Sequence, residues 1–171
     1  MKISYLAAIV FSPLILCACD STDTSPQNAT GNLNETTANE VTSQSGLAAV
    51  TSVVVTGESG NYSFGVTIES PDTGCNQYAD WWEVIRADGS LVYRRILAHS
   101  HVDEQPFTRS GSPVSVASDE EIIVRAHMNN SGYGEQVISG SVEQGLLTES
   151  LDTTFATELE TASPLPESCA F

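Results

Sequence analysis

The sequence has 171 residues, enough for one domain with short terminal segments. It contains 22 Asp and Glu residues against 6 Lys and Arg residues, which gives a formal net charge of −16 at pH 7. A surface this acidic repels nucleic acid and anionic lipid headgroups, so the composition excludes nucleic acid as a partner.

Residues 1–18 have the layout of a secretory signal peptide, with Lys2 as the only charge before an apolar stretch. The motif Leu16-Cys17-Ala18-Cys19 resembles the lipobox of bacterial lipoproteins, in which an obligatory cysteine follows the cleavage site. This resemblance implies export, cleavage before Cys19, and lipid on its thiol and amino group. The protein would then be anchored to the inner membrane, the outer membrane or the cell surface. The alternatives are cleavage without lipidation, or an uncleaved span, for which about 20 apolar residues are needed.

Residues 19–46 are rich in Ser, Thr and Asn and contain almost no large apolar side chain. Such a segment cannot bury enough surface to offset its ordering entropy, which predicts a disordered tether. Residues 47–171 remain as one folded domain. Removal of residues 1–18 leaves five arginines, no lysine and a formal charge of 5 − 22 = −17.

Two cysteines remain once Cys17 leaves with the signal peptide and Cys19 is lipidated. They are Cys75 and Cys169. An isolated pair in an oxidising compartment predicts a disulfide, which would close a loop of roughly 95 residues. The bridge would hold the C-terminal end of the chain against the body of the domain.

The domain has the pattern of β structure almost throughout. Apolar and polar side chains alternate from Tyr62 to Ile68, and Asp88-Gly89-Ser90 is typical of a hairpin turn. The predicted strands, in chain order, are residues 49–56, 62–68, 81–87, 91–101, 113–117, 121–129 and 135–142. The leucines of residues 147–160 fit either a helix or a strand, and the threonines among them favour a strand.

Seven to eight short strands in a domain of this size is the count of an immunoglobulin-like antiparallel β-sandwich. The segment Trp82-Glu83-Val84-Ile85 resembles the third strand of immunoglobulin or fibronectin type III domains. The resemblance implies an all-β fold with Trp82 in the core and Trp81 on the opposite face of the strand. It implies no function, because this architecture hosts many.

Three histidines form a candidate metal site. His99 and His101 project from one face of a predicted strand, and His127 lies on a later one. We expect the strand of Trp82 to lie between these two, so that the imidazoles reach the same end of the sheet. The carboxylates able to complete a mixed shell for Zn or Cu are those of Asp80, Asp103 and Glu104. Alternatively, the histidines only hydrogen-bond to nearby acidic residues.

All five arginines lie between residues 78 and 133, together with both tryptophans. The pattern predicts a cationic and aromatic face that binds an acidic glycan or the carboxylates of a protein partner. The residues assigned to this face are Trp81, Arg94, Arg95, Arg125 and Tyr133. Alternatively, each arginine pairs with an acidic residue inside the domain.

No catalytic signature is present, because the sequence has no G-x-S-x-G, phosphate-binding loop, C-x-x-C or H-E-x-x-H motif. The sequence therefore predicts a non-enzymatic, membrane-anchored, exported β-sandwich that acts as a binding or interaction module without a cofactor. The alternative function is a periplasmic protein that binds Zn or Cu through His99, His101 and His127.

Overall fold

The computed structural model describes residues 46–170. The predicted signal peptide, the lipidation site Cys19 and all but the last residue of the predicted tether lie outside this range. The elements are β1 (Ala49–Glu58), β2 (Asn61–Glu69), β3 (Ala79–Arg86), β4 (Leu91–Ile96), β5 (Phe107–Val114), β6 (Ile122–Met128), β7 (Gly132–Tyr133), β8 (Gln136–Ser141), β9 (Gly145–Ser150) and the 3-10 helix η1 (Thr157–Thr161). Within residues 46–170, no helix has the length and apolar character needed to cross a membrane.

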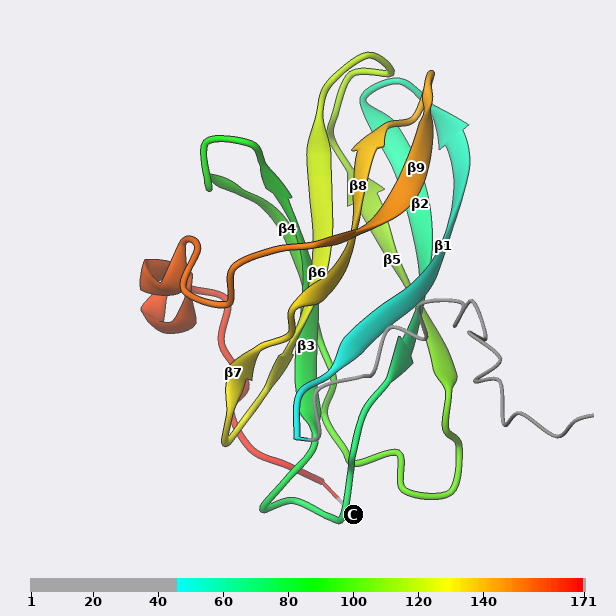
Figure 1. The fold of residues 1–171 in the computed structure, drawn as a ribbon. Coiled ribbons are helices and arrows are strands. Elements are labelled where there is room, and N and C mark those ends of the chain that lie inside the picture. Colours follow the sequence, from blue (N-terminus) through cyan, green and yellow to red (C-terminus); the bar gives the residue numbers. More distant parts are fainter. Residues whose placement is uncertain (1–45, 171) are drawn as a thin grey trace, which may run out of the picture. The chain divides into compact units, whose positions relative to one another are not determined.

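The strands form two antiparallel sheets (Figure 1). One sheet has the order β1-β2-β5, and the other has the order β4-β3-β6-β8-β9, with the short β7 paired to β6. The predicted all-β antiparallel sandwich is confirmed, with nine strands in the described part of the chain rather than seven or eight. The predicted position of β3 between β4 and β6 is also confirmed.

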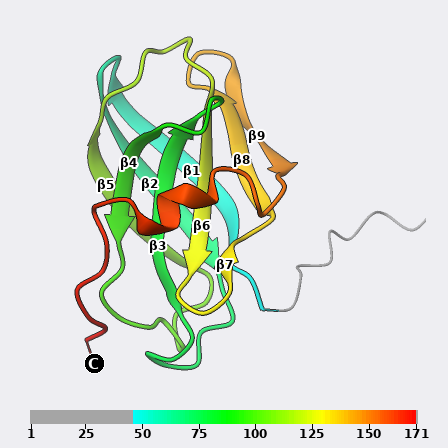
Figure 2. The same cartoon turned by 90° about the vertical axis from the view of Figure 1, so that its left-hand side faces the viewer.

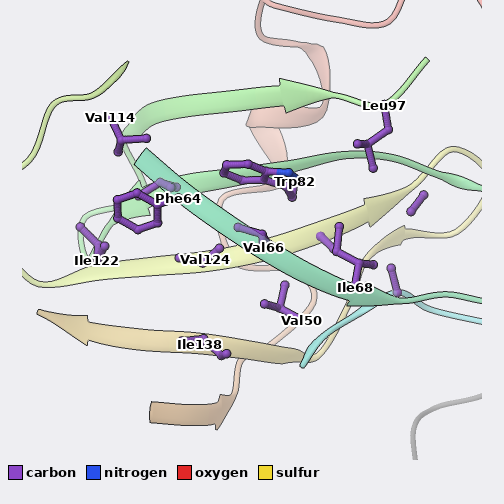
Figure 3. Packing of buried hydrophobic residues seen from close by; sticks show 14 of the residues in the cluster. Val50, Phe64, Val66, Ile68, Trp82, Leu97, Val114, Ile122, Val124 and Ile138 are labelled. Carbon is purple, nitrogen blue, oxygen red and sulfur yellow. The ribbon is translucent and has the colours of Figure 1, made fainter. Parts of the chain in front are cut away.

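The core lies between the two sheets and follows from the alternation within each strand. In β2 the side chains of Tyr62, Phe64, Val66 and Ile68 are buried, while the polar residues between them face outward. Trp82 is fully buried in the same layer, near Val66 (Figure 3). A side chain at Gly111 would place its Cβ only 2.8 Å from the Trp82 ring, so the close approach of β5 requires glycine.

The C-terminal segment, residues 151–170, covers the outer face of the larger sheet. It crosses β3 and β6 with η1 in the middle (Figure 2). Leu159 of η1 packs into a second apolar cluster with Trp81, Ile85 and Tyr133. Strand β3 is therefore buried on both faces, as its burial pattern shows.

Two predicted strands lie elsewhere in the structure. The predicted strand at 113–117 starts earlier in the structure, as β5 (Phe107–Val114). The sequence did not show this earlier start, because Arg109 and Gly111 stand at positions where an alternating strand would have apolar side chains. The predicted strand at 147–160 ends at Ser150, and the residues after it form a turn and then η1. Phe155 and Leu159 contribute to the second cluster from these non-strand positions.

The predicted disulfide is present between Cys75, in the segment before β3, and Cys169, with 5.6 Å between the two Cα atoms. Next to it, the backbone N–H of Ala170 donates to the carbonyl of Ala98 at 2.6 Å. The C-terminal segment is thus fixed covalently at one end, and β9 leads into it at the other.

Candidate functional site

The three histidines do not meet. The ring of His101 stacks on Phe107 with 3.8 Å between centroids, whereas His127 stacks on Trp81 at 3.7 Å. Phe107 belongs to the core between the sheets and Trp81 to the outer cluster. His101 and His127 therefore lie on opposite sides of the larger sheet.

The predicted metal site of His99, His101, His127 and Asp103 is consequently wrong. No group of three or more His, Cys, Asp and Glu side chains in the described range could hold a metal ion. The expected strand order was correct, but β4 ends at Ile96, so His99 and His101 lie in the loop that follows it. The alternation of β6 directs His127 to the outer face.

His101 is 3 % exposed, and neither ring nitrogen has a hydrogen-bond partner among the described residues. The carboxylate of Asp72 accepts a hydrogen bond from the backbone N–H of His101 at 2.8 Å, and lies 3.8 Å from its Nδ1. Burial lowers the pKa of His101, and the nearby Arg109 and His99 lower it further. The ring is therefore held neutral inside the fold.

This burial predicts a pH-dependent stability. The pKa of folded His101 lies below the ordinary value of 6.5, so below pH 6.5 the unfolded chain binds more protons and the folded state loses stability. His101→Phe keeps the stack on Phe107 and should remove this loss between about pH 6.5 and pH 5, measured by urea unfolding. The exposed His99→Gln should behave like the wild type. An unchanged pH dependence in His101→Phe would contradict the assignment.

The predicted cationic face is a buried ion-pair network. Glu83 pairs across the sheet with Arg94 of β4 and Arg125 of β6. Arg94 donates from Nε to Glu83 Oε2 at 2.8 Å, and its Nη2 lies 2.6 Å from the same oxygen. Arg125 donates from Nε to Glu83 Oε1 at 2.8 Å, and its Nη2 lies 2.7 Å from that oxygen. All three side chains are almost completely buried, and each guanidinium grips one carboxylate oxygen.

The remaining guanidinium N–H groups bind the C-terminal segment. Arg94 donates to the carbonyls of Leu159 (2.7 Å), Ala162 (2.7 Å) and Pro164 (3.0 Å). Arg125 donates to the carbonyls of Phe155 (2.5 Å) and Ala156 (3.1 Å), just before η1. The chain's own carbonyl groups thus occupy the positions that were expected for an external ligand.

The predicted binding face is therefore wrong as an open surface. Trp81, Arg94, Arg125 and Tyr133 are buried beneath the C-terminal segment, and Arg95 alone of the five predicted members is exposed. The alternative, in which the arginines pair within the domain, holds for Arg94 and Arg125. Burial also raises the pKa of the Tyr133 hydroxyl, which keeps it protonated.

A groove of about 680 Å³ lies beside this segment, next to the disulfide. The ends of β3 and β6, the turn between β6 and β7, and the C-terminal residues form its walls. Its polar lining includes Asp80, His127, Asn130, Ser131, Glu160 and Glu167.

His127 and Asp80, which both line this groove, form a close pair. Asp80 Oδ1 lies 2.7 Å from His127 Nδ1, and both side chains are more than nine-tenths buried. Because a carboxylate only accepts hydrogen bonds, this contact selects the tautomer with the proton on Nδ1 and the lone pair on Nε2. Glu160 Oε1 is 4.0 Å from this Nε2.

An imidazole oriented by a carboxylate can accept a proton or bind a cation through its second nitrogen. Within residues 46–170, no hydroxyl or thiol hydrogen-bonds to His127 Nε2, so the described site does not contain an activated nucleophile.

The sequence predicted only part of this site. His127 was recognised as a possible ligand and Asp80 as an optional partner, but the pair depends on a register shift between Ala79 and Trp81. This irregularity lets Asp80 reach the outer face, where a regular alternation would direct it inward. Glu160 was missed because η1 was expected to be strand.

No protein-family model and no solved structure matches the chain. A curated relative from Halomicrobium mukohataei, named "Putative lipoprotein", is 38 % identical over 82 residues, which are 48 % of this chain and 40 % of the relative. The chain thus matches less than half the length of that relative. Its name agrees with the lipobox in the sequence.

Proposed function

We propose that the chain is an exported lipoprotein whose β-sandwich is a non-enzymatic interaction module, held to a membrane by lipid on Cys19. The lipobox and the name of the relative support the anchor. The observation that supports the binding role is the groove at His127, where an oriented imidazole and a carboxylate face each other without a hydrogen bond between them. The groove takes the place of the arginine face as the binding surface.

The partner of this module is a glycan or a protein that reaches the groove from solution. Nucleic acid is not a candidate, because the groove is lined by carboxylates and the chain carries a large negative charge. Asn130 and Ser131 on the turn between β6 and β7 add hydrogen-bonding groups at the rim. No cofactor is part of the proposal.

The anchor is tested by Cys19→Ala, which removes the acyl acceptor. We expect the variant to accumulate as an unprocessed precursor or to leave the membrane fraction, as judged by detergent partitioning of cell extracts. Cys17→Ala is the matched control, because it removes a thiol from the same motif but leaves Cys19 in place. Membrane fractionation of Cys19→Ala equal to that of Cys17→Ala would overturn the lipoprotein proposal.

A further inference from the structure

We propose that the groove binds a primary ammonium group between His127 Nε2 and the Glu160 carboxylate. The inference rests on the assignment of the groove as the binding surface under the proposed function. It adds the chemical class of the ligand, which is an amine carried on a free small molecule or on a lysine side chain of a partner.

The first argument is the state of His127. Its hydrogen bond to Asp80 selects the Nδ1–H tautomer, in which Nε2 presents a lone pair. The side chain is 8 % exposed, and no described residue lies within hydrogen-bond distance of Nε2. The stack on Trp81 holds the ring in this orientation. Nε2 is not among the buried atoms that lack a partner, so it is accessible from the groove, where a ligand N–H group can donate to it.

The second argument is the separation of the two acceptors. The distance of 4.0 Å between His127 Nε2 and Glu160 Oε1 is too long for a hydrogen bond, so these two atoms do not pair with each other directly. An ammonium nitrogen about 2.8 Å from both atoms fits this separation and donates one N–H to each. A quaternary ammonium group has no N–H and cannot make these bonds.

The third argument is the charge of the lining. Asp80, Glu160 and Glu167 contribute carboxylates to the groove, and the described lining residues include no arginine. Two arginines are bound to Glu83, and two others pair with Glu120 and Glu104 elsewhere on the surface. A cation that enters the groove therefore meets no like charge from the described lining residues.

The test uses the full mature protein in detergent, with its disulfide intact and its histidines labelled with ¹⁵N. n-Butylammonium chloride is exchanged for sodium chloride at constant ionic strength, and the His127 nitrogen resonances are followed by NMR. We expect a saturable shift of Nε2. Glu160→Gln should weaken the affinity by about fivefold or more, because it replaces a charged acceptor with a neutral one.

Glu158→Gln is the matched control, since it makes the same charge change on the same 3-10 helix at an exposed residue outside the groove. Its affinity should stay within about twofold of the wild type, because exposed charges interact weakly. Equal weakening in the two variants would overturn the proposal, as it would indicate diffuse attraction to an acidic surface. Equal binding of tetramethylammonium would also overturn it.

Two further titrations identify the ligand class. Tighter binding of N-acetyl-lysine amide than of n-butylammonium supports a lysine side chain, and equal binding supports a free amine. A shift produced by Zn²⁺ but not by either amine would overturn the proposal in favour of a metal site. Failure of ammonium binding leaves the anchor intact, whereas failure of the Cys19→Ala test leaves the groove titration unchanged, so the two results are separable.

Discussion

Glu83→Gln is expected to reduce the free energy of unfolding by about 3 to 5 kcal/mol, the usual loss when one partner of a buried ion pair is removed. Glu83 is fully buried and neutralises the two guanidinium groups of Arg94 and Arg125. Glutamine preserves the shape and one acceptor oxygen but leaves two positive charges without a counter-ion. Urea unfolding with the disulfide intact measures the loss.

A surface pair provides the control for this experiment. Glu104 binds Arg109 through Oε2 at 2.6 Å, but its side chain is 60 % exposed. Glu104→Gln should therefore cost less than about 1 kcal/mol, because exposed ion pairs contribute little. Equally small effects in the two variants would mean that Glu83 is hydrated and that the C-terminal segment does not seal the network.

Trp81→Ala and Trp82→Ala should each cost roughly 3 to 5 kcal/mol, the range for truncating a buried large aromatic residue. Trp82 is fully buried between the sheets, and Trp81 is only 3 % exposed beneath the C-terminal segment. Trp81 also stacks on His127 and lies 4.5 Å from the Arg94 guanidinium. The sequence alone placed the Trp81 ring on an open face, where its truncation would cost much less.

The measurement is the pair of denaturation midpoints, compared with that of Val54→Ala as a control. Val54 is 62 % exposed on β1, so its truncation should have little effect on the free energy of unfolding. A Trp81→Ala midpoint close to that of Val54→Ala would show that the C-terminal segment leaves the outer face open in solution. Equal and large losses at both tryptophans would confirm that β3 is covered on both faces.

These tryptophans show where sequence analysis succeeded. The placement of Trp82 in the core followed from the alternation of side chains along one strand, which is a local property. The same holds for β2, whereas the order of β4, β3 and β6 followed from the expected immunoglobulin-like sandwich. The disulfide between Cys75 and Cys169 followed from counting the cysteines that remain after export and lipidation.

The covering of Trp81 could not be predicted in this way. It depends on a segment about 75 residues later in the chain, whose leucines and Phe155 fit both a helix and a strand. The strand prediction places Arg94, Arg125 and Glu83 on neighbouring strands. No local feature of the sequence shows that main-chain carbonyls accept hydrogen bonds from the remaining guanidinium N–H groups. If the C-terminal segment is left out, a buried ion-pair network and an open cationic face show the same arrangement of charged residues in the sequence.

The groove was missed for a related reason. His127 and Asp80 meet through a strand irregularity at Ala79, and Glu160 reaches them from η1. Neither feature has a signal in a single sequence, because a register shift changes the direction of a side chain without changing the residue type. The histidine was therefore identified as a candidate ligand but assigned to the wrong neighbours.

The most direct test of the proposed lipoprotein is the mass of the N-terminal peptide of the mature chain. The proposal predicts a peptide that begins at Cys19 and carries lipid on its thiol and amino group. A peptide that begins at Met1, or an unmodified Cys19 at the mature N-terminus, would contradict it.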